Sequence, residues 1–271
     1  MAKVLVVTSG KGGVGKTTST AALGAALAKM GQRVVVVDFD VGLRNLDLVM
    51  GAERRVVYDL IDVVQGNANL SQALIRDKRV DTLSLLPASQ TRDKDHLSPE
   101  GVERVINELR AMFDWIVCDS PAGIERGATL AMRHADIAVV VTNPEVSSVR
   151  DSDRIIGLLD SKTKKAEEGV QVEKHLLLTR YDPIRAERGD MLKVEDVLEI
   201  LSLPLLGIIP ESQEVLRASN IGTPVTLSNA TSAPARAYSE AARRLCGERL
   251  PIALTGEAKG FFSKFFARRA A

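Results

Sequence analysis

The chain has few cysteines, few aromatic residues and no long apolar run, and each shortage excludes a class of protein. Its 271 residues include two cysteines, Cys118 and Cys246, which lie far apart in sequence, so we expect reduced thiols rather than a metal pair or a disulfide framework. No stretch approaches the roughly 18 apolar residues of a membrane-spanning helix. The start also lacks a charged segment followed by an apolar stretch and a cleavage site. These shortages predict a protein that stays in the cytoplasm.

An excess of either charge is missing as well. Thirty-six basic residues stand against 35 acidic ones, a net charge of +1. No overall field therefore attracts nucleic acid, and we expect no nucleic-acid partner. Hydrophobic residues make up 45% of the chain and charged residues only 26%, which is enough apolar material to bury the core of one large domain.

Short β-branched runs alternate with helical patterns, which predicts an α/β fold: a doubly wound, mostly parallel sheet with helices on both faces. The expected strands are 3–8, 33–38, 82–86, 115–119, 137–142, 175–179 and 205–209. The expected helices are 17–30, 99–112, 149–159, 194–201 and 235–245. The polar stretch 161–173 reads as an exposed connection.

A glycine-rich loop follows the first expected strand, and its sequence is Gly10-Lys11-Gly12-Gly13-Val14-Gly15-Lys16-Thr17-Thr18. Its spacing is that of a phosphate-binding loop between a strand and a helix. We expect the four glycines to take positive φ and to turn their N–H groups toward phosphates, above the N-terminus of the next helix. Lys16 can reach the β- and γ-phosphates, and the Thr17 hydroxyl can ligate a bridging Mg²⁺ ion. The alternative is a glycine-rich turn with two solvated lysines, but the flanking strand and helix favour a nucleoside triphosphate site.

Acidic residues leave the ends of two other expected strands. Asp38 and Asp40 follow the second strand, and Asp119 ends the fourth. Ligands of doubly wound sheets bind at the carboxyl ends of the strands, where an aspartate can hold a Mg²⁺-bound water. Gly123, four residues after Asp119, suits a loop that senses the γ-phosphate. Aspartates at strand ends also make turns and cap helices, and this structural alternative stays open.

Lys11 is not required by the phosphate-loop pattern, and it resembles the signature lysine of the deviant Walker A ATPases. This P-loop family contains septum-site, plasmid-partition and nitrogenase-reductase proteins. Several further runs resemble its septum-site branch over nearly the whole chain: 42–47, 53–59, 86–93, 142–150 and 178–182. The resemblance implies hydrolysis of ATP to ADP and phosphate, slow without an activating partner.

The resemblance also assigns roles to single residues. Lys11 would cross the interface of an ATP-bound homodimer to the partner's nucleotide, and Lys16 would contact the phosphates. Asp40 would position the attacking water. Mg²⁺ would be held by the Thr17 hydroxyl and, through water, by two aspartates, Asp119 and Asp38.

The expected base is adenine. Guanine-specific proteins read their base with an Asn-Lys-x-Asp loop, and the comparable stretch 179–182 lacks the first two residues of that code. In the resembled family the adenine packs near this loop and near the turn at 210–212. Arg180 and Pro210 are therefore candidates for the base pocket, although either residue could serve packing or surface solvation alone.

The C-terminal end carries a second functional signal. Four of the six phenylalanines fall within six positions: Phe261, Phe262, Phe265 and Phe266. On a helix these rings would span about 140°, with cationic residues around them, among them Lys259, Lys264 and Arg268. Such a segment suits the surface of an anionic inner membrane and resembles the membrane-targeting sequence of the septum-site branch, with phenylalanines where leucines are common. The alternative is a core helix docked on the sheet. We therefore divide the chain into an ATPase domain (1–247), a linker (248–258) and an amphipathic segment (259–271).

Partners and rival functions complete the expectations. The resemblance implies a division inhibitor and an activating regulator, with Arg150, Asp151 and Asp153 as a candidate partner surface, unless these residues are solvated helix caps. One rival is a partition-type ATPase that binds DNA, disfavoured by the near-neutral charge. Another is an iron–sulfur carrier, disfavoured by the distant cysteines. A third is a nucleotide-sensing membrane scaffold with little hydrolysis. We favour the septum-site interpretation, and we expect the protein in the cytoplasm and peripherally bound to the inner face of the cell membrane.

Overall fold

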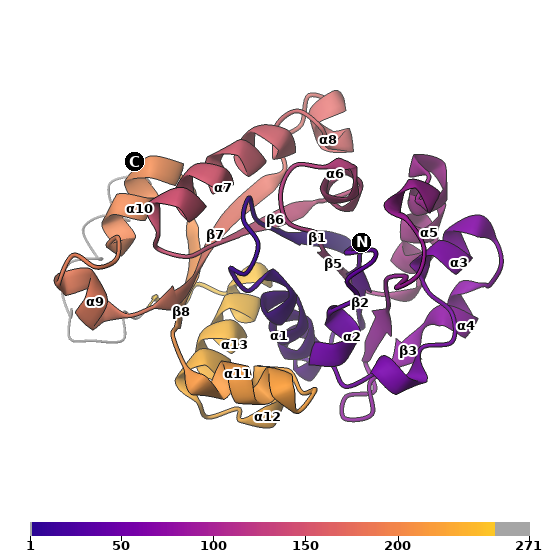
Figure 1. Ribbon diagram of the computed structural model, residues 1–271, viewed down its shortest axis with the longest axis horizontal. Helices are drawn as coiled ribbons and strands as arrows, with labels where there is room; N and C mark the ends of the chain where they lie inside the picture. Colours follow the sequence, from indigo (N-terminus) through magenta and orange to yellow (C-terminus); the bar gives the residue numbers. More distant parts are fainter. Residues whose placement is uncertain (1, 253–271) are drawn as a thin grey trace.

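Eight strands form one sheet in the order β3-β4-β2-β5-β1-β6-β7-β8 in the computed structural model, which describes residues 2–252 (Figure 1). Their bounds are β1 Lys3–Thr8, β2 Val34–Asp38, β3 Ile75–Arg76, β4 Leu83–Leu86, β5 Trp115–Asp119, β6 Ile137–Thr142, β7 Glu173–Tyr181 and β8 Leu205–Pro210. Neighbouring strands run parallel, except that the short edge strand β3 is antiparallel to β4. The expected mostly parallel sheet is confirmed.

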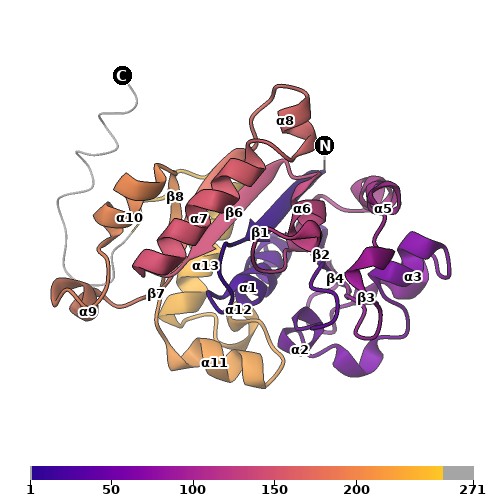
Figure 2. The ribbon, with the colours of Figure 1, turned by 45° about the horizontal axis from the view of Figure 1, so that its top comes forward.

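Helices cover both faces of the sheet, as a parallel sheet requires (Figures 1 and 2). One face carries α1 Lys16–Lys29, α11 Gln213–Asn220, α12 Val225–Ser228 and α13 Ala233–Leu245. The other carries α5 Pro99–Met112, α6 Arg126–Met132, α7 Val146–Leu159 and α10 Val194–Leu201. Shorter helices join them: α2 Leu46–Val49, α3 Leu60–Gln65, α4 Leu70–Ala73, α8 Lys164–Glu167 and α9 Pro183–Glu187. Two 3₁₀ turns lie at Glu53–Arg55 and Lys94–His96.

Strand β1 divides its side chains between two cores. Val4 and Val6 pack into the cluster under α5, α6 and α7, whereas Leu5 and Val7 pack into the cluster under α1 and α13. Successive side chains of a strand point to opposite faces, so a strand with helices on both sides must be apolar throughout. Burial of each such side chain is worth about 1.5–3 kcal/mol, which fixes the strand whose end carries the phosphate loop.

The stretch 161–173 is not only a connection. It contains α8, where the Thr163 hydroxyl accepts a hydrogen bond from Ala166 N at 3.1 Å, and its last residue, Glu173, begins β7. A helix of four residues has no apolar period, so the sequence pattern could not predict it. Residues 259–271, with the expected membrane segment, lie outside the described residues. Within 2–252, no helix combines the length and hydrophobicity that a bilayer crossing needs.

Candidate functional site

The glycine loop joins β1 to α1 at the carboxyl edge of the sheet, and only part of its expected backbone geometry is present. Gly13 and Gly15 have φ of 76° and 96°, but Gly10 and Gly12 do not have positive φ, so that prediction is wrong for these two. Gly10 serves a different purpose, because a Cβ there would lie 2.1 Å from the backbone oxygen of Asp151. Gly10 thus allows the loop to lie directly against α7.

Lys16 is the first residue of α1, and its ammonium group is turned inward. The residue is 8% exposed, and Nζ donates a hydrogen bond to Ser9 Oγ at 2.9 Å. Ser9 Oγ in turn donates to the carbonyl of Lys11 at 2.7 Å. Burial lowers the pKa of Lys16, while the negative charges of Asp119 and Asp40 act to raise it. The structure therefore places a desolvated amine within the loop, where a phosphate would replace lost hydration.

Lys11, in contrast, is directed outward to the start of α7. Its Nζ lies 3.1 Å from Glu145 Oε2 and 3.0 Å from Ser147 Oγ, and 41% of its side chain is exposed. Both acceptors belong to the same subunit. Neither was selected from the sequence, because each lies more than a hundred positions from Lys11 and no local pattern connects them.

Two carboxyl groups lie side by side beneath the loop. Asp38 on β2 and Asp119 on β5 are register partners, and both are buried. Burial raises the pKa of Asp119 to about 7, although hydrogen bonds from Thr17 and Thr20 act to lower it. Thr20 Oγ1 lies 3.1 Å from Asp119 Oδ1. Burial, followed by the charge of Asp119, raises the pKa of Asp38 well above its ordinary value. Two adjacent buried carboxyls favour a cation, and with the Thr17 hydroxyl they form the oxygen-rich donor set that suits Mg²⁺.

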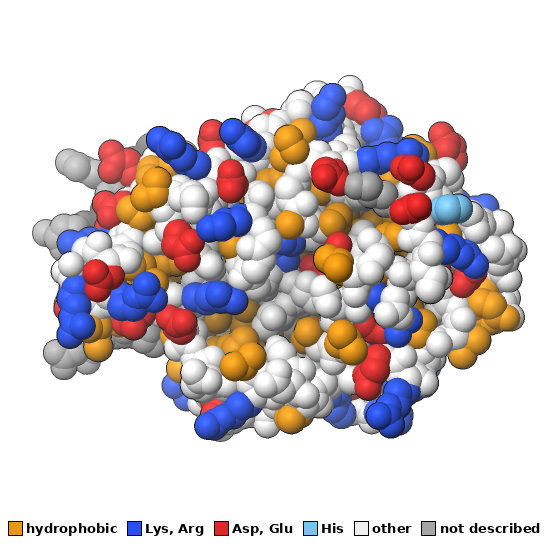
Figure 3. Space-filling view, in the orientation of Figure 1, with side chains coloured by type: hydrophobic (Ala, Val, Ile, Leu, Met, Phe, Trp, Pro, Cys, Tyr) orange, Lys and Arg blue, Asp and Glu red, His pale blue; other side chains and the backbone are white. Residues whose placement is uncertain are grey.

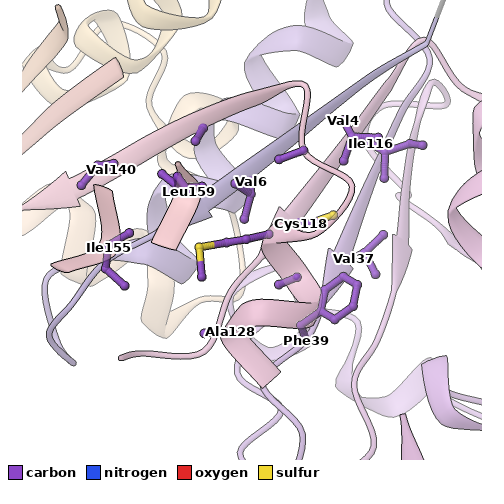
Figure 4. Packing of buried hydrophobic residues seen from close by; sticks show 14 of the residues in the cluster. Val4, Val6, Val37, Phe39, Ile116, Cys118, Ala128, Val140, Ile155 and Leu159 are labelled. Carbon is purple, nitrogen blue, oxygen red and sulfur yellow. The ribbon is translucent and has the colours of Figure 1, made fainter. Parts of the chain in front are cut away.

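Asp38 also shapes the loop that carries Asp40. Its two oxygens accept hydrogen bonds from Asp40 N at 2.8 Å and from Leu46 N at 3.3 Å, so the carboxyl bridges both ends of the loop. Phe39, which lies between Asp38 and Asp40 in the sequence, packs into the core beside Ala128 of α6 (Figure 4). This anchoring leaves Asp40 half-buried on the wall of the phosphate cleft, and burial raises its pKa while Lys16 lowers it.

Two adjoining cavities extend from the loop. The phosphate cleft, of about 670 Å³, is lined by the loop, Asp40, α2 and residues 121–127. The second cavity, of about 440 Å³, lies over β7 and β8 and the start of α11. Both expected base-pocket residues line the second cavity, and Arg180 and Ser219 line both. Arg180 has a φ of 54°, a strained backbone state for a residue other than glycine. The pair of cavities fits a nucleotide, with phosphates in one and the nucleoside in the other.

Two buried hydroxyl groups support the site and were not singled out from the sequence. Thr179 Oγ1 lies 2.7 Å from the carbonyl of Val14 in the loop and 2.9 Å from Asn143 Oδ1. Tyr238 Oη pairs with Ser19 Oγ of α1 at 3.0 Å beneath the second cavity. Each hydrogen bond joins segments that are remote in sequence, so only the fold reveals them.

The candidate partner surface lies on the first half of α7. Arg150 and Asp153 are exposed, as a contact surface requires, whereas Asp151 is half-buried and its backbone lies against Gly10. The start of this helix also holds Lys11. A partner bound here would therefore lie next to the phosphate loop.

Comparison with known proteins identifies relatives that match nearly the full chain. Residues 5–225 match the family described as the CobQ/CobB/MinD/ParA nucleotide binding domain. The chain is 60% identical over 269 residues to the septum site-determining protein MinD of Escherichia coli (strain K12), covering 98% of this chain and 99% of that protein. Among solved structures, the MinC:MinD cell division protein complex of Aquifex aeolicus is 44% identical, with a TM-score of 0.81 over 94% of this chain and 100% of that chain. MinD of Pyrococcus horikoshii OT3, complexed with Mg-ADP, is 32% identical, with a TM-score of 0.80 over 90% of this chain and 96% of that chain.

Proposed function

This chain belongs to the CobQ/CobB/MinD/ParA nucleotide-binding family as an ATPase of septum-site determination, and from that premise we propose that ATP-dependent pairing of two copies switches its membrane binding. ATP and Mg²⁺ are its ligands, in keeping with the Mg-ADP held by the relative from P. horikoshii. The observation that carries the proposal is the outward position of Lys11. Contacts of its Nζ with Glu145 and Ser147 hold the side chain at the surface.

Phosphate binding relies on groups already in place. The amides of the loop and the N-terminal end of α1 face the anion, and Lys16 exchanges its bond to Ser9 for phosphate oxygens. Thr17 would ligate Mg²⁺ directly, and Asp119 and Asp38 would hold it through water. When bound, Mg²⁺ supplies positive charge that neutralises the phosphates and lets both buried carboxyls stay ionised.

Hydrolysis requires a positioned water. Asp40, on the wall of the phosphate cleft, orients that water for in-line attack on the γ-phosphorus and takes its proton. The bond from the γ-phosphorus to the β–γ bridging oxygen breaks, which leaves ADP and phosphate. The pKa of Asp40, raised by burial, makes this carboxylate a stronger proton acceptor than an exposed one. In a single copy the cleft is open to solvent, so a second copy is needed to exclude bulk water and raise the rate.

Lys11 provides the link between copies. Its contacts within the subunit are exposed, and exposed ion pairs are worth only about 0.2–1 kcal/mol. A partner's triphosphate offers several charge-assisted hydrogen bonds, each worth about 1.5–3 kcal/mol. Lys11 therefore leaves Glu145 and Ser147 when two ATP-loaded copies meet. Loss of the γ-phosphate removes the stronger acceptor, and the pair separates.

The membrane step follows from two nearly equal and opposite free energies in the segment 259–271, the gain from lipid binding and the cost of ordering the chain. Burial of its four phenylalanines is worth about 6–12 kcal/mol, and each basic group near anionic lipid adds about 1 kcal/mol. Ordering about ten residues costs about 10–20 kcal/mol. One segment is close to break-even, whereas two on one dimer gain about 10²–10⁴ in apparent affinity through their shared effective concentration. Pairing thus controls attachment to the inner face of the membrane.

The direct test is sedimentation of the intact chain with anionic vesicles under ADP, ATP and a non-hydrolysable ATP analogue. We expect the protein in the pellet with ATP and the analogue, and in the supernatant with ADP. The mass of the protein itself should double under the two conditions in which it pellets. A chain ending at Ala258 should bind nucleotide yet stay in the supernatant. Equal pelleting under every nucleotide, without doubling of mass, would reject the switch.

Partners extend the same proposal. The A. aeolicus relative forms a complex with MinC, and a MinC-like division inhibitor is the expected ligand of the dimer here. A MinE-like activator would stimulate hydrolysis, with Arg150, Asp151 and Asp153 of α7 as the candidate contact surface. The partition-type alternative gains no support from the face seen in Figure 3, where basic and acidic side chains are interspersed. A DNA gel shift with ATP separates the two functions.

A further inference from the structure

The end of α2 and the loop after α11 touch backbone to backbone. Gly51 and Gly222 have φ of 64° and 63°. A Cβ on Gly51 would lie 2.5 Å from the Gly222 oxygen, and one on Gly222 would lie 2.7 Å from the Gly51 Cα. Because neither position has room for a side chain, the two segments cannot come closer together, and a shift of one segment toward the other must displace it.

Arg79, on the turn between β3 and β4, ties the same two segments. Its guanidinium donates to the Gly222 carbonyl at 3.0 Å and to Thr223 Oγ1 at 2.8 Å on one side, and to the Met50 carbonyl at 2.8 Å on the other. The buried carboxylate of Asp77 holds the guanidinium from behind, at 3.1 and 2.6 Å. Only a planar fork of several donors can make these bonds together, so lysine cannot replace this arginine.

Each tied segment leads to a different part of the nucleotide site. Helix α2 begins at Leu46, whose N–H is bonded to Asp38, and its Leu48 and Val49 line the phosphate cleft. Ser212 caps the N-terminus of α11 and, like Leu216 of that helix, lines the second cavity, which is the expected base pocket. Arg79 and the glycine pair therefore join the C-terminal ends of two helices, one of which lines the phosphate cleft and the other the base pocket.

We propose that Arg79 is a positioning residue that couples occupancy of the base pocket to the placement of the Asp40 loop. This inference rests on the proposed function for the identity of the ligand. Entry of a base positions α11, and the contacts of Gly222 and Arg79 pass that position to Met50 and α2. The N–H of Leu46 at the N-terminus of α2 is hydrogen-bonded to Asp38. A ligand that has a base therefore fixes the position of the Asp40 loop, whereas phosphates alone do not.

Deuterium exchange of the full chain with Mg²⁺ and either ADP or inorganic pyrophosphate, each at saturation, tests this coupling. In the unaltered protein, we expect the amides of residues 46–52 to exchange at least about threefold more slowly with ADP than with pyrophosphate. In Arg79→Lys this difference should vanish at 46–52, while ADP still protects 213–220. A merely structural role for Arg79 would lower protection with both ligands equally.

Arg104→Lys is the matched control. Arg104 of α5 also ties two backbone carbonyls, those of Val63 and Val64 at 2.8 and 3.0 Å, but lines neither nucleotide cavity. This variant should keep the difference between the two ligands. If Arg79→Lys does not fold, Thr223→Val removes one acceptor with little change of shape and should reduce the difference by at least about half.

A difference between ADP and pyrophosphate that persists at 46–52 in Arg79→Lys or Thr223→Val overturns the coupling, as does its absence from the unaltered protein. ADP does not require dimer formation in our proposal, so this experiment reads a single copy. Failure of ATP-dependent pairing on vesicles would reject the membrane switch and leave this result unaffected.

Discussion

Lys11 and Lys16 belong to one loop but are held in opposite ways. Lys16 is buried, is bonded to Ser9 within the loop, and has a pKa lowered by burial. Lys11 is exposed and rests on Glu145 and Ser147 of α7. In our proposal the inner lysine serves a phosphate bound in its own subunit, whereas the outer one exchanges its weak contacts for a partner's phosphate. One glycine-rich sequence thus combines a fixed binding group with a movable one.

Lys16→Ala breaks the fixed half and has the largest expected effect. It removes the buried cation that replaces hydration around the β- and γ-phosphates and with it several charge-assisted hydrogen bonds, so ATP affinity should fall by at least about 1,000-fold. Calorimetric titration with Mg-ATP measures the loss, and a thermal melt checks folding. Lys11→Ala is the matched control and should bind ATP as a monomer within about threefold of the unaltered protein. Equal losses in both variants would show that the two lysines do not differ as proposed.

Asp40→Ala separates binding from hydrolysis. The side chain lines the cleft without anchoring the loop, because the loop's hydrogen bonds to Asp38 use backbone N–H groups. Turnover measured in the presence of vesicles should fall on the order of 10²–10³, with ATP affinity nearly unchanged and the ATP-bound dimer accumulating. Asp190→Ala, which removes an exposed carboxylate, should hydrolyse ATP normally. Unimpaired turnover in Asp40→Ala would remove this residue from the reaction.

The sequence predicted the strands best where both faces are buried. The bounds of β1, β5 and β6 agree with the expected ranges, because the interior residues of these strands form continuous apolar runs that are buried on both faces. Helices such as α2 and α4, of four residues each, were missed because they are shorter than one apolar repeat. The expected roles of Asp38, Asp119, Arg180 and Pro210 remain predictions, although the fold brings all four to the carboxyl edge of the sheet.

Contacts between distant segments were beyond prediction from one sequence. Lys11 and its acceptors, Gly10 and Asp151, and the Gly51 and Gly222 pair become neighbours only when the sheet order is known. A glycine was expected to mean positive φ, but Gly10 is required for close approach instead. The physical reason is the same in each case: local patterns report backbone preference and burial, not which elements pack together.

The buried carboxyl of Asp119 should make the stability of the protein depend on pH. The pKa of Asp119 is about 7 in the folded protein, against an ordinary value of 3.8 for the unfolded chain. At a pH between these two values, the folded state holds a proton that the unfolded state has lost. Without nucleotide, this carboxyl makes unfolding harder as pH falls below about 7, by up to about 1.4 kcal/mol per pH unit. Asp119→Asn should remove that contribution between pH 7 and 5, measured by urea unfolding. Parallel pH profiles in both proteins would contradict it.

Glu145→Gln with Ser147→Ala weakens the movable half and has the smallest expected effect. The two substitutions remove the negative charge of Glu145 and the hydroxyl of Ser147, which together hold Lys11 in its own subunit, and an exposed ion pair of this kind is worth up to about 1 kcal/mol in each copy. Because both copies of a dimer lose this pair, dimerisation with a non-hydrolysable ATP analogue should tighten by about twofold to 30-fold, measured by sedimentation velocity over a range of protein concentrations. Glu108→Gln breaks a comparable exposed pair with Arg104 and should leave dimerisation unchanged. Unchanged dimerisation in the double variant would mean that these contacts do not compete with the partner's phosphate for Lys11.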